Sequence, residues 1–507
     1  MEASKKKRFS FPTAFTVLFI VLILAAILTA IVPAGSYDRL AYDADTKAFT
    51  ITKADETSET LPGTQATLDK MGIKVNISKF EDASIRKPLA IPGTYMRLDN
   101  KPQGALEVLK APVTGVGESF DIILFVFIIG GCIGVLNASG AIGAGLAALS
   151  RATKGKEYML IIFITFLIGL GGTTFGMAEE TIALYPIMIP IFLIAGYDAI
   201  VCIAAIYMGS SIGTMFSTVN PFSSVIASNA AGITFTEGMT FRIIGLVIAL
   251  IITMIYIIRY AEKVKKDPSK SIIAYQTDEI HARFLKNYDE KEVPPFTWKR
   301  ILMLVLFVGA FGVMIYGVSS PTLGWWFAEM TTLFLGVGII LCFLSGLGEK
   351  AAVHNFIAGS ADLVGVALTI GLARAINIVM DSGSISDTIL YFASGAVHGM
   401  NGSLFSVMMM FVYTILGFFI PSSSGLAVLS MPIMAPLADT VGLSRDIIVS
   451  AYQYGQGLMA FITPTGLILA TLSMVDVTYD KWLKFIMPLM GIIGAFAAVM
   501  LVIQAMF

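Results

Sequence analysis

The sequence is poor in charged residues. Only 14% of its 507 residues are charged, whereas 56% are hydrophobic, and the formal net charge is −1. Soluble proteins carry about 25% charged residues, so this composition excludes a soluble multidomain protein and predicts a chain that crosses a membrane many times. The balanced charge gives the chain no overall field that attracts nucleic acid, and we expect no nucleic-acid partner.

Cysteine and histidine are also scarce. The three cysteines, Cys132, Cys202 and Cys342, all lie in apolar runs, and the three histidines are widely separated. We therefore expect neither a disulfide framework nor a metal site, and no cofactor. The apolar runs hold no histidine partner for a serine nucleophile, so we do not expect an enzyme. The longest charged linker is too short for the output domain of a receptor.

The charged residues are concentrated in two segments. Between Asp38 and Lys110 there are 22, eleven of each sign, among Val-, Ile- and Thr-rich pieces and Pro-Gly turns. This pattern predicts a small β-rich cap or loop. Between Arg259 and Arg300 there are 17, ten basic and seven acidic. Because loops rich in Lys and Arg stay in the cytoplasm, we place this second segment there.

The N-terminal segment predicts a membrane anchor. A basic run, Lys5 to Arg8, precedes an apolar core from Phe15 to Val32 that is long enough to cross the ~30 Å hydrocarbon layer. A cleavable signal peptide would have a shorter core. The basic run places the N-terminus in the cytoplasm and the segment after Pro33 outside, in a multi-pass protein of the cell membrane.

The chain also matches itself at an offset of 246 residues. Pro186–Met188 aligns with Pro432–Met434, and Gly209 aligns with Gly455, so the matches fall on small and helix-breaking residues. The first unit starts outside and the second starts inside, which makes the two units inverted, a common plan of secondary transporters. We expect an all-α polytopic membrane protein with two inverted-topology repeats, each containing a re-entrant hairpin and a broken helix. Its expected parts are the N-terminus with the first transmembrane helix (1–33), the extracytoplasmic loop or cap (34–117), repeat 1 (118–260), the cytoplasmic linker (261–300), connecting helices (301–360) and repeat 2 (361–507).

The first unit must cross the membrane an odd number of times to end in the cytoplasm. We therefore expect Glu118–Ser150 to turn once near Asn137–Gly140, and residues 173–195 to enter and leave from the cytoplasmic side. This arrangement places the basic residues of Arg151–Lys156 outside, against the usual charge bias.

Two adjacent carboxylates, Glu179 and Glu180, lie in the middle of an apolar region. An ionisable group there costs about 2.5–3.5 kcal/mol, so it is a functional candidate for which a partner is expected. Neighbours on an α-helix point about 100° apart, so we expect at most one of them to face the substrate. The alternative is a structural ion pair with Arg374. Arg374 also shares one helix face with Asn377 and Asp381, a stripe that we interpret as an interhelical network.

Further polar residues interrupt the apolar runs at equivalent places in both units. Backbone broken in this way is tolerated in lipid where it lines a cavity or is buried in protein. Hydroxyl, amide and carbonyl groups at such breaks hydrogen-bond a substrate, and a helix start offers its amides to an anion. The predicted substrate-binding residues are Thr173, Thr174, Gly176, Glu179, Glu180, Ser217, Asn220, Ser422, Ser423, Ser424, Gly425, Gln453, Gln456, Thr463 and Thr465.

Several of these elements resemble the YfcC family, part of the anaerobic dicarboxylate-carrier group of the ion transporter superfamily. The resemblance lies in Gly171–Thr181, with its Gly-Met-Ala-Glu-Glu, in Asn220–Phe222, Ile420–Gly425 and Ala451–Gln453, and in the Pro-Thr pair at Pro464. It covers nearly the whole chain. It implies two inverted repeats with re-entrant hairpins and unwound helices, in a homodimer that works by an elevator-like motion. Some close relatives look like arginine/ornithine exchangers, whereas the wider group is named for four-carbon dicarboxylates.

The charge of the two hairpins favours a basic amino acid over a dicarboxylate. Glu179 or Glu180 would repel a dianion but would bind a guanidinium or ammonium group through charge-assisted hydrogen bonds. Ser422–Gly425 and Asn220 would then hold the α-carboxylate and the α-amino group. The alternative is a sodium- or proton-coupled carrier of a four-carbon dicarboxylate, with Glu180 as the ion site. A coupling ion, sodium or proton, stays open.

Overall fold

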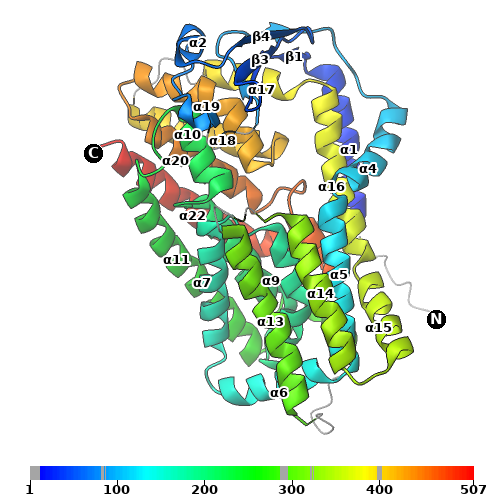
Figure 1. Ribbon diagram of the computed structural model, residues 1–507. Coiled ribbons are helices and arrows are strands. Elements are labelled where there is room, and N and C mark those ends of the chain that lie inside the picture. Colours follow the sequence, from blue (N-terminus) through cyan, green and yellow to red (C-terminus); the bar gives the residue numbers. More distant parts are fainter. Residues whose placement is uncertain are drawn as a thin grey trace, which may run out of the picture.

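The computed structural model describes residues 12–81, 85, 87–285, 295–319, 323, 325–396 and 402–506 (Figure 1). Parts of five expected segments lie outside the described residues: the first eleven residues of 1–33, residues 82–84 and 86 of the loop or cap, residues 286–294 of the linker, residues 320–322 and 324 of the connecting helices, and residues 397–401 and 507 of repeat 2. The cytoplasmic location of the N-terminus therefore stays a prediction.

Among the described residues, eight stretches are long and apolar enough to cross a membrane. Each has at least 18 residues, which spans about 27 Å of helix and suits the hydrocarbon layer. The prediction of a mostly helical, polytopic membrane protein is confirmed. The stretches are α1 (Ala14–Ile31), α5 (Phe120–Ala138), α11 (Met239–Lys266), most of α13 (Trp298–Ser319), α14 (Phe327–Leu344), the region Glu349–Ser382, α18 (Gly402–Phe419) and α22 (Tyr479–Gln504).

A small β-rich cap, here residues 34–103, lies at one end of the molecule (Figure 1). Its four-stranded antiparallel sheet has the order β4-β3-β2-β5, and a second pair joins β1 to β6. Alternate residues such as Leu40 and Phe49 point inward and meet Leu68 and Phe80 in an apolar core. The elements are β1 (Gly35–Ser36), β2 (Arg39–Asp43), β3 (Ala48–Thr52), β4 (Ser58–Pro62), α2 (Gln65–Lys70), α3 (Ser78–Glu81), β5 (Leu89–Ala90) and β6 (Met96–Arg97).

The first unit consists of long helices interrupted at two places. After α4 (Ala105–Glu118) and α5, the chain forms a hairpin whose arms α7 and α8 are joined through residues 175–184, and a broken helix whose parts α9 and α10 are separated by residues 216–225. The first interruption contains Gly176 and the second contains Pro221, residue types that disfavour a continuous helix. The remaining bounds are α6 (Ala141–Thr153), α7 (Tyr158–Thr174), η1 (Glu179–Leu184), α8 (Tyr185–Ile194), α9 (Ala199–Met215), η2 (Pro221–Val225) and α10 (Ile226–Ala231).

The second unit repeats this order of elements. Its hairpin is α18 and α19, with a break at residues 420–422, and its broken helix is α20 and α21, with a break at residues 461–467. In Figure 1, α18, α19 and α20 lie in the half of the molecule that carries the cap, and α6, α7 and α9 lie in the other half. Inverted repeats require such an arrangement, although an inverted symmetry relation stays a prediction. The bounds are α16 (Val364–Ser382), α17 (Ser386–Ala396), α19 (Ser423–Thr440), α20 (Arg445–Ala460) and α21 (Ile468–Met474).

Glycines at equivalent positions let the helices approach closely. A Cβ added to Gly209 of α9 would lie 2.8 Å from the carbonyl oxygen of Thr165 in α7. A Cβ added to Gly455 of α20 would lie 2.3 Å from the carbonyl oxygen of Met410 in α18. Only glycine permits these contacts, which fix the hairpin against the broken helix in each unit.

Connecting elements lie between the two units. They are η3 (Pro268–Lys270), η4 (Ala274–Gln276) and α12 (Thr277–Phe284), followed by α13 and α14 and by α15 (Glu349–Ala361), which continues into α16.

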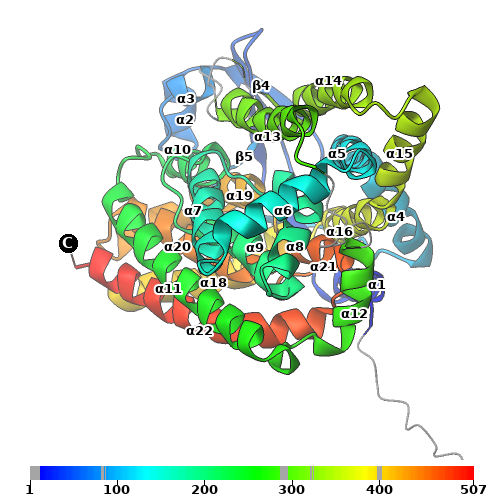
Figure 2. The same cartoon turned by 90° about the horizontal axis from the view of Figure 1, so that it is seen from below.

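The expected return of α6 across the membrane is wrong. Lys265 Nζ lies 2.7 Å from Glu157 Oε2 beyond the end of α6, and Arg300 Nε donates to the carbonyl oxygen of Ser139 just before its start. Both ends of α6 therefore lie on the side of the charged linker. In Figure 2, α5 is viewed along its axis, whereas α6 is viewed from the side. With 13 residues, α6 is about 20 Å long, too short to cross. The basic residues of Arg151–Lys156 lie with the linker, which removes the conflict with the charge bias.

Candidate functional site

The interruptions of both units meet around one cavity of about 610 Å³, called the central cavity here. Residues of both hairpin tips and of both broken helices line it, together with residues of α4, α5, α14 and α16. The lining is mixed: carboxylates, hydroxyls and amides lie beside the aromatic rings of Tyr207, Phe222, Trp326 and Phe327. A concave space of this size, with a few convergent polar groups, suits a small-molecule substrate.

The tip of the first hairpin brings two carboxylates to the central cavity. Glu180 is 8% exposed, and its Oε2 accepts a hydrogen bond of 3.0 Å from the backbone N–H of Ala178. Glu179 is partly buried, and both residues line the cavity. That at most one of them faces the substrate stays a prediction. The two residues begin a 3₁₀ helix directly after Ala178, whose backbone (φ −140°, ψ −79°) is not helical, and the angular spacing of an α-helix does not hold at such a start.

Arg374 does not pair with these carboxylates. Its Nε lies 2.8 Å from Glu118 Oε2 at the end of α4, so the alternative of an ion pair between Arg374 and Glu179 or Glu180 is wrong. The contact joins α16 to α4, as an interhelical network would, but Arg374 and Asn377 also line the central cavity. Asp381, the third residue of the stripe, lines a neighbouring cavity.

The tip of the second hairpin presents three serines. Ser422 caps α19, since its Oγ accepts a hydrogen bond of 3.1 Å from the backbone N–H of Gly425. Ser424 Oγ accepts a hydrogen bond of 2.8 Å from Lys87 Nζ of the cap. Ser422, Ser423 and Ser424 line the central cavity, whereas Gly425 lines the neighbouring one.

The breaks of the two long helices contribute amide and hydroxyl groups. Asn220 is buried and spans to the first hairpin, because its Nδ2 donates to the carbonyl oxygen of Gly172 at 3.2 Å. Gln456 Nε2 donates to the carbonyl oxygen of Pro421 at 3.1 Å, which ties α20 to the second hairpin. Thr463 and Thr465 share a hydrogen bond of 2.7 Å. All four of these side chains, and Gly176, line the central cavity.

Five of the predicted residues do not line the central cavity. Thr173 and Ser217 are buried in contacts between elements: Thr173 Oγ1 lies 3.2 Å from Thr218 Oγ1, and Ser217 Oγ accepts a hydrogen bond of 2.7 Å from Gln453 Nε2. Thr174 Oγ1 donates a hydrogen bond of 2.6 Å to the carbonyl oxygen of Leu170 in its own helix. The fifth is Gly425. These hydroxyl groups and Gln453 Nε2 are hydrogen-bonded within the protein, whereas Gln453 Oε1 is buried without a partner among the described residues.

Other residues line the central cavity that the sequence did not single out as binding residues. Ser210, Ser211 and Thr214 belong to the small-residue cluster of α9, so their pattern was visible. Asp121 and Lys87 come from elements outside the breaks, and nothing local in the sequence marks them. The cavity-lining residues not predicted to bind include Lys87, Glu118, Ser119, Asp121, Tyr207, Ser210, Ser211, Thr214, Phe222, Trp326, Phe327, Arg374 and Asn377.

Two curated relatives match most of this chain. A Haemophilus influenzae protein without an assigned function is 48% identical over 505 residues, covering 99% of each chain. YfcC of Escherichia coli K12, whose name as a basic amino acid antiporter is provisional, is 32% identical over 398 residues, covering 76% of this chain and 78% of its own. The resemblance to the YfcC family is confirmed.

Two solved transporter structures also align with the chain, at a TM-score of 0.38 each. YdaH of Alcanivorax borkumensis is 14% identical, with 97% of this chain and 98% of its own covered. MtrF of Neisseria gonorrhoeae, from a class described as antimetabolite efflux pumps, is 16% identical, with 98% and 95% covered. Similarity at this level carries no argument about fold or substrate.

The family match is decisive. Residues 11–506 match the family described as DcuC, C4-dicarboxylate anaerobic carrier, which is nearly the whole chain. The matched region includes the hairpins and breaks that surround the central cavity. The chain thus belongs to the C4-dicarboxylate anaerobic carrier family and is a multi-pass membrane transporter, not an enzyme.

Proposed function

We propose that this transporter exchanges basic amino acids of the arginine and ornithine type across the cell membrane. The observation that carries the proposal is the charge of the central cavity. Four carboxylates line it, Glu118, Asp121, Glu179 and Glu180, against two cations, Lys87 and Arg374. Glu118 and Arg374 neutralise each other. Among the described residues, Asp121, Glu179 and Glu180 take part in no ion pair, so the cavity favours a cationic guest.

The two hairpin tips divide the recognition between them. Glu179 and Glu180 bind the guanidinium or ammonium group of the side chain, because an ionised acceptor forms stronger hydrogen bonds with a cation than water does in a confined site. The hydroxyls of Ser422, Ser423 and Ser424 and the amide of Asn220 hold the α-carboxylate and the α-amino group. A substrate with both kinds of group bridges the first unit to the second.

The exchange itself is proposed to be an elevator-like motion in a homodimer. Both hairpins and both broken helices are tied together by the glycine contacts of Gly209 and Gly455 and by the bond from Gln453 to Ser217. A body joined in this way moves as one unit and carries the cavity with it. The helices α13 and α14 and the continuous stretch of α15 and α16 are proposed to form the static part.

Counterflow in proteoliposomes tests the substrate. Vesicles are loaded with arginine, ornithine, lysine or succinate, and the entry of labelled arginine is followed with and without a sodium or pH gradient. We expect loaded arginine and ornithine to drive entry without any gradient. Entry that only loaded succinate supports contradicts the proposal.

Substitution of the carboxylates tests the charge pairing. Glu179→Gln and Glu180→Gln each keep the side-chain shape and remove the charge, and a lost charged hydrogen bond of about 1.5–3 kcal/mol corresponds to a rise of roughly 10- to 150-fold in the arginine KM. Glu349→Gln, at an exposed position at the start of α15, is the control and keeps the parent KM. If both cavity variants keep the parent KM, the charge pairing is refuted.

One alternative has support of its own. The family is described by C4-dicarboxylates, and Lys87 and Arg374 provide two cations in the central cavity. A sodium- or proton-coupled dicarboxylate carrier would use these cations for the substrate and Glu180 for the coupling ion. Succinate counterflow that requires a sodium or pH gradient would support this function.

A further inference from the structure

The cap supplies one side chain to the transport cavity. Lys87 lies in the loop between α3 and β5, and its ammonium group reaches the tip of the second hairpin, where Nζ donates to Ser424 Oγ at 2.8 Å. Lys87 also lines a second cavity of about 410 Å³ between the cap, the ends of α16 and α17 and the second hairpin. The two cavities share Lys87, Arg374, Asn377, Pro421 and Ser422, so they meet at Lys87.

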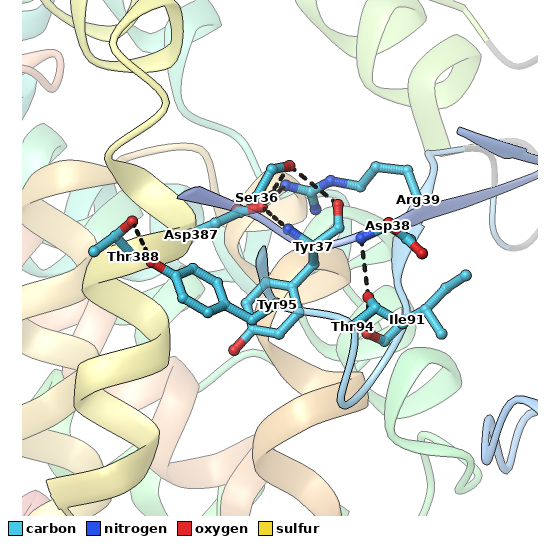
Figure 3. Close-up of polar contacts among 9 residues, drawn as sticks. All are labelled: Ser36, Tyr37, Asp38, Arg39, Ile91, Thr94, Tyr95, Asp387 and Thr388. Atoms are coloured by element: carbon cyan, nitrogen blue, oxygen red, sulfur yellow. Dashed lines mark hydrogen bonds and ion pairs between the residues drawn. The ribbon is translucent and has the colours of Figure 1, made fainter. Parts of the chain in front are cut away.

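The strand β5, which follows Lys87, is tied to α17 through the cap. Asp387 is buried at the start of α17. Each of its two carboxylate oxygens accepts a hydrogen bond of 2.7 Å from Arg39, and Oδ2 also accepts one of 2.8 Å from the backbone N–H of Tyr37 (Figure 3). Tyr95 adds a hydrogen bond of 2.9 Å to Thr388. Arg39 pairs with Ala90 in the sheet, so the strand that follows Lys87 is bonded to the strand that carries the anchor. The strand next to Lys87 is therefore anchored to α17 through β2.

Lys87 has no counter-ion within the part of the chain that the structure describes. None of the ion pairs of the described residues includes it, whereas Arg374, the other cation that lines the central cavity, is paired with Glu118. The serine hydroxyl that Lys87 contacts leaves its charge uncompensated, and two of its three ammonium hydrogens are available to another acceptor. The nearest polar groups on the hairpin are hydroxyls, which also donate to an anion.

We propose that Lys87 of the cap binds the carboxylate of the substrate at the tip of the second hairpin, together with Ser424. The inference rests on the proposed function only for the identity of the substrate, because both substrate classes considered above carry a carboxylate. It assigns the cap a direct role in recognition, through a residue remote in sequence from both repeats. Because a simple cation has no carboxylate for Lys87 to bind, the cap then favours zwitterions over simple cations as substrates.

A substrate analogue without the carboxylate provides the test. Agmatine is arginine without its α-carboxylate, and both are used to compete with labelled arginine in counterflow. In the Lys87→Gln variant, loss of a charged hydrogen bond predicts that half-inhibition by arginine needs about tenfold more compound, whereas the value for agmatine stays within twofold. Lys87→Arg keeps the charge and keeps the preference for arginine.

Lys74→Gln is the matched control. Lys74 also joins the cap to the second hairpin, 3.4 Å from Asp439, but it lines neither cavity. Its loss leaves both values unchanged if Lys87 acts by binding. Equal weakening of arginine and agmatine in Lys87→Gln, or the same loss of preference in Lys74→Gln, overturns the inference. If the parent protein carries succinate and not arginine, the proposed function fails. The inference is then tested with succinate against its monoamide, and an unchanged preference in Lys87→Gln refutes it.

Discussion

Gly176 shows how one residue shapes the first hairpin. Its φ of +77° lies in the left-handed region, and an added Cβ would lie 2.8 Å from Asn220 Oδ1. Asn220 cannot yield, because its amide is bonded to the carbonyl oxygen of Gly172 and to the N–H of Phe222. Gly176→Ala therefore adds about 1–2 kcal/mol of backbone strain and displaces a cavity residue. We expect the counterflow rate to fall at least tenfold, measured at equal amounts of reconstituted protein.

Gly346→Ala is the control that separates the effect of backbone strain from the effect of displacing Asn220. Gly346 also has a positive φ, +70°, but an added Cβ meets no atom within 4 Å. The control variant bears a similar backbone cost and keeps its transport rate within about twofold. If both variants lose transport equally, the contact with Asn220 is not the cause.

At the scale of the element, α20 carries two glutamines with different roles. Gln453 is 1% exposed and bonds Ser217 in the broken helix of the first unit, whereas Gln456 lines the central cavity. Gln453→Ala removes buried hydrogen bonds, and we expect the free energy of unfolding to fall by about 1–3 kcal/mol with little change in KM. Gln456→Ala should raise the KM, and the loss of its hydrogen bond to Pro421 should also lower stability. Thermal unfolding in detergent and counterflow measure both, and reversed results would exchange the two roles.

The sequence predicted the elements of the site better than their contacts. Clusters of Gly, Pro, Ser and Thr located both hairpin tips and both helix breaks, because interrupted backbone in lipid must line a cavity or be buried in protein. The same rule does not distinguish these two outcomes, so Gln453 and Gln456 received the same role. Lys87 and Asp121 were missed for another reason: their place at the cavity depends on tertiary packing, which has no local signature.

At the scale of the whole molecule, hydropathy and charge predicted the fold class but not the path of each helix. Residues 122–150 carry no charged side chain, so their composition is compatible with two crossings or with one crossing and a surface helix. The ion pair between Glu157 and Lys265 shows that α6 is a surface helix, because it holds the end of α6 on the side of the linker. Lys265 and the N–H of Gly155 lower the pKa of Glu157 to about 2. A lowered carboxyl pKa stabilises the fold above the ordinary pKa of about 4.5, and this contribution is lost only as the pH falls towards 2.

The relative sidedness of these loops can be measured in whole cells. In a background without Cys132, Cys202 and Cys342, single cysteines replace three exposed residues: Ala44 of the cap, Lys154 after α6 and Lys266 at the end of α11. Lys154→Cys and Lys266→Cys must react alike with a membrane-impermeant maleimide, because the ion pair of Glu157 and Lys265 holds their segments on one side. Ala44→Cys must react differently, since the cap lies at the opposite end of the molecule (Figure 1). The basic linker predicts that only Ala44→Cys is labelled before the cells are permeabilised. Labelling of Lys154→Cys together with Ala44→Cys in intact cells would restore the crossing of α6 and contradict the structure.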